Sequence, residues 1–299
     1  MKARTAVEPR QATLGIRLAD FVELTKPRIA LMVVLTAGIG ILLASNGRVD
    51  PSLVVHALLG TGLVAAGSGA LNHLIERDLD ALMTRTAERP LPAGRMGSDA
   101  ALLFGVALSV AGLVELTLAV NLLTALLGAA ALAGYIFVYT PLKRVSPLAT
   151  IIGAVPGALP PVMGWTAVAD RIEPGAWVLF GILFFWQLPH FLAIAWMCRD
   201  DYARAGFPML PVVHPDGRST ARQMILYGAA LVPMSLLPSI LGLTGATYFL
   251  GAFVLGFFFL AVCVTFALSH SLAAARRVLL VSVVYLPAVL AVMVLDRIT

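Results

Sequence analysis

The stretch LVVHALLGTGLVAAGSGALNHLIERDLDALMTRTAERPLP, residues 53–92, joins a long apolar run to a segment crowded with charge. The apolar run, Leu53–Ile75, is long enough to cross a bilayer, which requires about 20 helical residues. The charged segment, Asn72–Pro92, places four acidic residues among three arginines. We therefore expect a membrane helix that ends in a polar site at one surface.

Asn72, Glu76 and Asp80 follow one another at intervals of four residues. In a helix such residues drift by about 40° per step, so their oxygen-bearing side chains share one face. Carboxylate and amide oxygens suit Mg²⁺, which fills its remaining positions with water and substrate phosphates. Arg85 and Arg89 could clamp the same phosphates with forked hydrogen bonds. Because carboxylates are unfavourable near the C-terminal end of a helix, this row indicates a functional site.

The composition places this stretch in a membrane protein. The chain has 299 residues, of which 60% are hydrophobic and 12% charged, and its mean hydropathy is +0.92. These values exclude an ordinary soluble domain. Nine apolar runs can span a bilayer: 29–45, 53–75, 100–119, 122–139, 147–168, 177–197, 225–243, 248–270 and 278–295. We predict an all-α integral membrane protein with nine transmembrane helices around a central cavity that opens at the cytoplasmic side.

The distribution of Lys and Arg predicts the orientation. Of the 21 basic residues, all but Arg48, Arg171 and Arg297 fall in the N-terminal segment or in connections on the same side. The positive-inside rule therefore places the N-terminus in the cytoplasm and the C-terminus outside. No removable signal peptide is evident. We expect a cytoplasmic segment over residues 1–28, a single polytopic domain over 29–299, and a location in the cell (inner) membrane.

A second acidic cluster, Asp200 and Asp201 beside Arg199, lies at the cytoplasmic end of the run 177–197. It either neutralises nearby arginines in a solvated loop or, with the first cluster on the same side, contributes to one site. His190 lies within that run, where hydrogen bonding to a neighbouring helix is the commoner role and ligand binding the alternative. Glu115 lies near an outer helix end, where we favour a structural role.

The sequence leaves the roles of two further features undecided. Lys26, Lys143 and Arg144 stand at cytoplasmic helix ends, where topology alone explains them and substrate contact is the alternative. The run 147–168 contains many helix breakers. They free backbone groups that lipid cannot satisfy, so this segment should be buried or line a cavity.

Several motifs carry a resemblance to a known family. The set Asn72, Glu76, Asp80, followed by RTAERPL at 85–91, resembles the first acidic motif of the intramembrane prenyltransferases, which join isoprenoid diphosphates to acceptors. LTKPRI (24–29), YTPLKR (139–144), GAVPGALPPVMGW (153–165), WQLPHF (186–191) and RDDYARAGFPMLP (199–211) resemble its haem O synthase branch. Other branches usually carry two aspartates where this chain has Phe191 and Cys198, which leaves the number of metals open.

The resemblance implies a reaction and a set of roles. A farnesyl group would pass from farnesyl diphosphate to a vinyl group of haem B, with addition of water, giving haem O and diphosphate for haem-copper oxidase biogenesis. The implied catalytic residues are Asn72, Glu76, Asp80, Arg85, Arg89, Lys143 and Arg144. The implied Mg²⁺ ligands are Asn72, Glu76, Asp80, Asp200 and Asp201. The residues implied to contact haem or diphosphate are His190, Gln187, Tyr139 and Arg199.

The resemblance also implies haem A synthase or a terminal oxidase assembly as a downstream partner, within the lipid bilayer, and no nucleic acid. Two alternatives remain. A prenyltransferase with an aromatic acceptor, as in quinone biosynthesis, would share the first motif. A divalent-cation or anion transporter would also carry intramembrane carboxylates and broken helices, but near the bilayer midplane.

Overall fold

The structure, a computed structural model, describes residues 18–45 and 49–298. Residues 1–17, and with them most of the predicted cytoplasmic segment, lie outside this range. The regular secondary structure of the described part is helical, apart from one isolated β-bridge between Thr244 and Arg297. Its elements are α1 (Leu18–Leu24), α2 (Pro27–Ala44), α3 (Pro51–Asp80), α4 (Ser98–Ala119), α5 (Leu122–Ala133), the π-helix η1 (Gly134–Tyr139), α6 (Thr140–Leu142), α7 (Ala149–Ala158), α8 (Pro160–Ala169), α9 (Pro174–Met197), α10 (Arg199–Arg204), α11 (Leu210–Val213), α12 (Arg218–Ile240), α13 (Ala246–Ser269) and α14 (Leu272–Leu295).

Nine helical segments in the described part of the chain are long and apolar enough to cross a membrane, as the apolar runs predict. α5, η1 and α6 together form the fourth span, and α7 and α8 form the fifth. The ends differ from the prediction where a helix continues beyond its apolar run. α3 extends five residues past Ile75 to Asp80, and α12 begins at Arg218, seven residues before Ile225. Hydropathy marks the apolar part of a helix, whereas backbone hydrogen bonding continues the helix into the polar residues beyond it.

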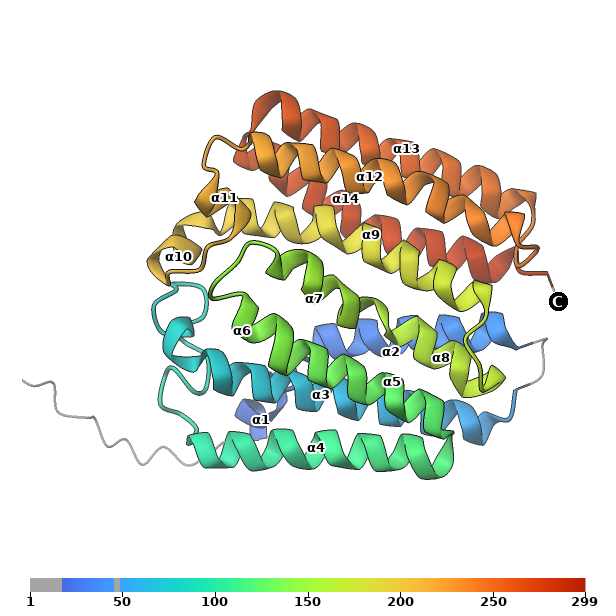
Figure 1. The fold of residues 1–299 in the computed structure, drawn as a ribbon, viewed down its shortest axis with the longest axis horizontal. Coiled ribbons are helices and arrows are strands. Elements are labelled where there is room, and N and C mark those ends of the chain that lie inside the picture. Colours follow the sequence, from blue (N-terminus) through green and yellow to red (C-terminus); the bar gives the residue numbers. More distant parts are fainter. Residues whose placement is uncertain (1–17, 46–48, 299) are drawn as a thin grey trace, which may run out of the picture.

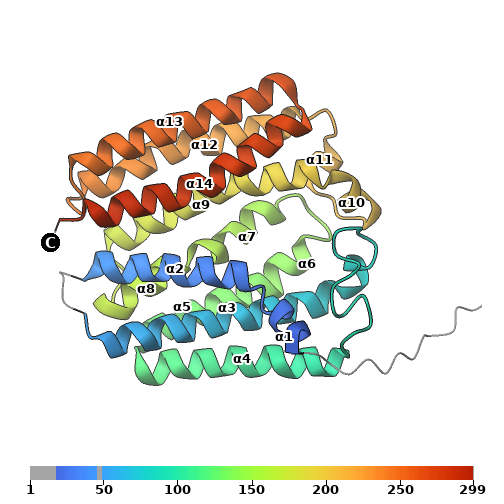
Figure 2. The ribbon, with the colours of Figure 1, turned by 180° about the vertical axis from the view of Figure 1, so that it is seen from behind.

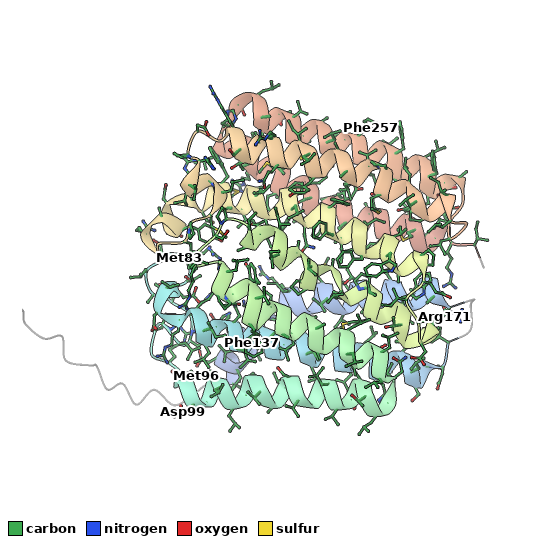
Figure 3. All side chains as sticks on the ribbon, in the orientation of Figure 1. Met83, Met96, Asp99, Phe137, Arg171 and Phe257 are labelled. Atoms are coloured by element: carbon green, nitrogen blue, oxygen red, sulfur yellow. The ribbon has the colours of Figure 1, made fainter. Side chains whose placement is uncertain are left out.

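The long helices run roughly parallel or antiparallel in two groups (Figures 1 and 2). α9, α12, α13 and α14 form one group, and α3, α4 and α5 the other, with α2, α7 and α8 between them. The segment between α3 and α4 gathers with α10 and α11 at one end of the bundle, and the described C-terminus lies at the other. Figure 3 labels residues at the two ends of the bundle: Met83, Met96 and Asp99 lie at the end that holds α10 and α11, and Arg171 lies at the opposite end.

The α2–α8 crossing brings two backbones into direct contact. A Cβ at Gly164 would lie 1.8 Å from the carbonyl oxygen of Ala37, and one at Gly40 would lie 2.1 Å from the carbonyl oxygen of Pro161. No side chain fits at either position, so glycine permits this approach. The crossing fixes α2, and the Lys26 turn that precedes it, relative to the interior of the bundle.

The span rich in helix breakers is divided at Leu159, between α7 and α8. Its residues Pro160–Ala167 are buried, as predicted for such a segment. Side chains outside this span donate hydrogen bonds to its carbonyls: Gln187 Nε2 of α9 donates to Ala154 O at 2.8 Å, and Asn121 Nδ2, at the N-cap of α5, donates to Thr166 O at 2.8 Å. Polar groups in this span therefore find protein partners instead of facing lipid.

Candidate active site

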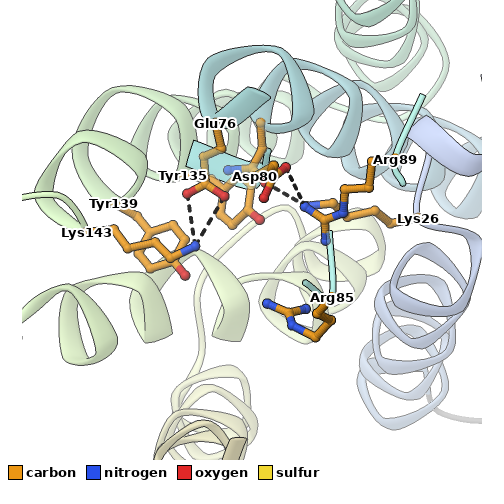
Figure 4. Close-up of a pocket in the computed structure, with 9 residues that line it drawn as sticks. Lys26, Glu76, Asp80, Arg85, Arg89, Tyr135, Tyr139 and Lys143 are labelled. Carbon is orange, nitrogen blue, oxygen red and sulfur yellow. Dashed lines mark hydrogen bonds and ion pairs between the residues drawn. The ribbon is translucent and has the colours of Figure 1, made fainter. Parts of the chain in front are cut away.

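A cavity of about 120 Å³ lies at the charged end of the bundle (Figure 4). It is enclosed by α3, the segment 81–97, the α1–α2 turn and the η1–α6 segment. The lining residues are Lys26, Asn72, Glu76, Asp80, Arg85, Arg89, Tyr135, Tyr139 and Lys143. The structure thus brings together residues up to 117 positions apart in the chain, from Lys26 to Lys143.

The polar row of α3 forms one wall of this cavity. Asn72, Glu76 and Asp80 are all buried and all line it. α3 ends at Asp80, so the last carboxylate stands at the helix C-terminus. There the helix dipole disfavours negative charge, and the carboxylates require compensation from cations.

Each member of the row meets a different cationic side chain. Lys143 Nζ lies 3.0 Å from Glu76 Oε1 and 3.2 Å from Oε2. Arg89 Nη1 donates to Asp80 Oδ2 at 2.7 Å, and Lys26 Nζ donates to the amide oxygen of Asn72 at 2.6 Å. Figure 4 shows Lys143 on one side of the row, with Arg89 and Lys26 on the other.

The π-helix η1 supplies the opposite wall. Asn72 Nδ2 donates to Thr140 Oγ1 at 3.2 Å, and Thr140 Oγ1 donates to the carbonyl of Tyr135 at 2.8 Å. The rings of Tyr135 and Tyr139 stack with centroids 5.2 Å apart. One-turn π-helical segments within α-helices occur frequently at functional sites, because the wider turn redirects side chains.

The cavity carries an excess of positive charge. Four cationic side chains, Lys26, Arg85, Arg89 and Lys143, line it with two carboxylates. Burial, and after it the nearby Arg89, lowers the pKa of the Lys26 ammonium to about 7, against the opposing effect of Glu76. Arg85 is exposed at the mouth, and its guanidinium makes no ion pair or hydrogen bond with any residue that the structure describes. Such a site favours a ligand with several negative charges.

The donor set fits a hard divalent cation that shares its coordination with a ligand. Asp80 Oδ1 is buried and has no hydrogen-bond partner in the described part of the chain, which leaves one oxygen free for a metal. Within the same residues, no three His, Cys, Asp or Glu side chains converge to hold an ion by themselves. Two carboxylates and one amide oxygen need completion by water or ligand oxygens, which is the usual environment of Mg²⁺.

The second acidic cluster does not line this cavity. Asp200 has a side chain that is 91% exposed, and its contact with Arg199 is 3.8 Å long. Asp201 Oδ1 accepts the backbone N–H of Thr84 at 3.3 Å, and Arg204 bonds both Asp201 and the Thr84 hydroxyl. Burial acts to raise the pKa of the Asp201 carboxyl, but the hydrogen bond from the Thr84 backbone N–H and the charge of Arg204 lower it, and the net direction is downward. Asp201 therefore anchors the segment that carries the cavity arginines.

Other predicted site residues also lie outside the cavity lining. Arg144 donates to the carbonyl of Ile75 at 2.5 Å and so binds the last turns of α3. Gln187 bonds the broken span, as described above. His190 lies 2.8 Å from the hydroxyl of Ser282 on α14, measured from Nδ1 to Oγ. Arg199 packs over the ring of Trp196 at 4.6 Å.

Sequence reasoning left two lining residues unassigned. Lys26 remained undecided between anchoring and substrate contact, and Tyr135 was not singled out. The available signal for Tyr135 was its spacing of four residues from Tyr139, which places both rings on one helix face. Glu115, for which we favoured a structural role, contacts His56 of α3 at 2.5 Å.

Comparison with known proteins gives matches over nearly the whole chain. The model of the UbiA prenyltransferase family matches residues 33–286. Proteins named protoheme IX farnesyltransferase are similar throughout: that of Solibacter usitatus is 52% identical over 289 residues (94% of this chain, 99% of the relative). That of Koribacter versatilis is 47% identical over 299 residues (97% and 96%), and that of Salinibacter ruber 46% over 279 residues (93% and 99%).

Solved structures share the fold at low sequence identity. The structure of a digeranylgeranylglyceryl phosphate synthase is 18% identical with a TM-score of 0.79, covering 93% of this chain and 98% of its own. A UbiA homologue from Archaeoglobus fulgidus bound to GPP and Mg²⁺ is 18% identical with a TM-score of 0.69, covering 92% and 99%. The described residues therefore share the fold of these solved structures.

Proposed function

The chain belongs to the UbiA prenyltransferase family, and on that premise we propose that it transfers a farnesyl group from farnesyl diphosphate to a vinyl group of haem B. Water adds in the same reaction, and the products are haem O and diphosphate. Relatives that are 40–52% identical over most of their length carry the name of this activity. Membership of this family argues against a transporter, and the names of these relatives favour haem over an aromatic acceptor.

The cation-rich cavity is the observation that carries the proposal. A prenyl diphosphate presents a compact, multiply charged head and a long apolar tail. The head matches a pocket in which four cationic side chains outnumber two carboxylates. Arg85, which lacks a partner among the described side chains, is placed to meet the incoming anion at the mouth, and guanidinium groups bind phosphate oxygens in pairs.

A divalent metal completes this site in our proposal. Mg²⁺ would be held by Asn72, Glu76 and Asp80, and it would supply charge neutralisation on the leaving diphosphate. The free Oδ1 of Asp80 supports this assignment. A UbiA homologue bound to GPP and Mg²⁺ supports a metal requirement within the fold. Asp200 and Asp201 receive no comparable support, because neither lines the cavity.

The protein's own residues stabilise the charges that develop during the reaction and exclude water from the farnesyl cation. Arg85, Arg89 and Lys143 stabilise the negative charge that develops on diphosphate as the allylic C–O bond breaks. Tyr135 and Tyr139 line the same cavity, where aromatic rings stabilise a nearby cation. A site between membrane helices keeps water from the farnesyl cation until a vinyl carbon of haem B has bonded to it. Water then captures the benzylic-type cation on the porphyrin side chain and loses a proton.

The distribution of basic residues supports a location for the cavity and an orientation of the chain in the membrane. We place the cavity at the cytoplasmic side of the inner membrane, with the N-terminus inside and the C-terminus outside, in a single polytopic domain over residues 29–299. Apart from Arg171 and Arg297, the basic residues of the described chain gather at the end that holds the cavity, and the positive-inside rule assigns such an end to the cytoplasm. A product that remains in the bilayer would pass to haem A synthase or to a terminal oxidase assembly.

Mass measurement of haem tests the proposal. Purified protein in detergent is incubated with haem B, farnesyl diphosphate and Mg²⁺, with and without chelator. We expect a farnesylated, hydrated haem in the presence of Mg²⁺ and none with chelator. Prenylation of a hydroxybenzoate in place of haem would overturn the acceptor, and undiminished haem O formation with chelator would overturn the metal requirement.

A further inference from the structure

Ser282 of α14 forms a polar junction with α9 inside the bundle. Its side chain is fully buried. Trp186 Nε1–H donates to its carbonyl at 2.8 Å, and its hydroxyl oxygen lies 2.8 Å from His190 Nδ1 and 2.6 Å from the carbonyl oxygen of Leu279. The ring of His190 is stacked on that of Trp186, with centroids 5.1 Å apart and planes inclined by 28°.

These distances decide which nitrogen of His190 carries the proton. Two oxygens 2.6 Å apart must share a proton, and the carbonyl of Leu279 has none to give. The single hydroxyl proton of Ser282 is therefore donated to Leu279. The Ser282 oxygen can then act towards His190 only as an acceptor, so Nδ1 bears the hydrogen. In a neutral imidazole, the state favoured at membrane depth, Nε2 is left with its lone pair.

The Nε2 atom has no partner in the described part of the chain. It makes no hydrogen bond there, and it is not among the buried unpartnered atoms, so it remains accessible on a half-buried ring. His190 stands seven residues before the end of α9, about 10 Å inward along the helix axis. At that depth water is scarce, and an exposed acceptor is satisfied by a ligand that is itself soluble in the membrane.

We propose that Ser282 is a positioning residue that holds His190 in the Nδ1–H tautomer, so that Nε2 ligates the iron of the haem substrate. This inference rests on the proposed function, in which haem is the iron-bearing reactant. Histidines that bind metals usually donate their other N–H to an oxygen, which fixes the tautomer and raises ligand basicity. The Ser282 hydroxyl supplies that acceptor, and the Trp186 ring holds the plane of the imidazole.

Titration of the full-length protein with haem B, followed by Soret absorption and electron paramagnetic resonance, tests this role. The wild type should show the signature of histidine-ligated haem, and His190→Ala should lose it. Ser282→Ala should weaken haem affinity about 10- to 100-fold, the usual effect of removing an outer partner of a metal ligand. Ser282→Thr, which retains the hydroxyl, should restore it. Ser235→Ala is the matched control. Ser235 of α12 is as buried as Ser282, and its hydroxyl is hydrogen-bonded to Tyr285, which lies on α14 like Ser282.

Iron-free protoporphyrin IX separates ligation from packing. It offers no iron, so wild type, Ser282→Ala and His190→Ala should bind it with equal affinity. In turnover, Ser282→Ala should raise KM for haem and leave KM for farnesyl diphosphate unchanged. Equal weakening of both porphyrins, or a wild-type haem spectrum in His190→Ala, would overturn the inference while haem O formation stood. A His190-dependent spectrum without haem O formation would overturn the proposed function alone.

Discussion

Lys143 holds both carboxylate oxygens of Glu76, at 3.0 and 3.2 Å from its ammonium nitrogen, and both side chains are buried. The ring of Phe207 lies against the ammonium, 4.5 Å from nitrogen to ring centroid. If the proposed Mg²⁺ takes the Glu76 oxygens that Lys143 now holds, the ammonium is released and can turn towards the diphosphate. We therefore expect binding of the metal and binding of the anion to be coupled through this one side chain.

Replacing Lys143 with methionine should make stability dependent on metal. Without Mg²⁺, Glu76 is left as an unpaired buried charge, and breaking a buried ion pair costs about 3–5 kcal/mol. With Mg²⁺, the freed carboxylate gains a new partner. We expect a lower Tm than wild type in chelator and a larger rise on adding Mg²⁺, measured by thermal unfolding in detergent. Equal Mg²⁺-induced shifts in both proteins would contradict the coupling.

Asp80→Asn should reduce farnesyl transfer about 100-fold or more, because it removes a charge from the proposed metal site while keeping the side-chain volume. Asp78→Asn is its control, since Asp78 lies two residues away with an 83% exposed side chain. The measurement is haem O formation by mass at saturating Mg²⁺. Full activity in Asp80→Asn would refute the assignment of Asp80 to the metal.

Asp201→Asn distinguishes an anchor from a metal ligand. Loss of the charge-assisted bond to Thr84 should free the segment that carries Arg85 and Arg89. At about 1–2 kcal/mol for such a bond, KM for farnesyl diphosphate should rise roughly tenfold. Asp200→Asn should be neutral. The Mg²⁺ concentration for half-maximal rate should stay as in the wild type, whereas a large increase would show that Asp201 binds metal.

Gly164→Ala should disrupt the α2–α8 crossing. The added methyl would meet the Ala37 carbonyl at 1.8 Å, and backbone cannot yield as a side chain can. We expect a loss of about 1–3 kcal/mol or more, seen as a lower Tm. Gly38→Ala is the matched substitution on α2, where the nearest atom is 3.9 Å away, and it should leave Tm unchanged or raise it. Similar Tm values for both variants would contradict the packing argument.

The number of spans could be predicted because bilayer thickness imposes one length on every helix that crosses it. The grouping of Asn72, Glu76 and Asp80 could also be predicted, since it depends on helical periodicity within one segment. The partners of these residues could not. Lys143 reaches Glu76 across 67 residues of sequence, and that contact depends on how η1 and α6 pack on α3.

Asp201 shows what residue type alone leaves undecided in the second cluster. A carboxylate near arginines has the chemistry of a metal ligand and of a loop anchor alike. The difference lies in the position of Thr84, whose N–H faces Asp201. Position in space, and not residue type, separates the two roles.

The concentration of charge at one end of the bundle also affects how the two products leave the site. Diphosphate, released among lysines and arginines beside water, can depart into the aqueous phase. The farnesylated porphyrin, more apolar than its precursor, favours lipid. We therefore expect the two products to leave through different phases, so that neither must pass the other on the way out.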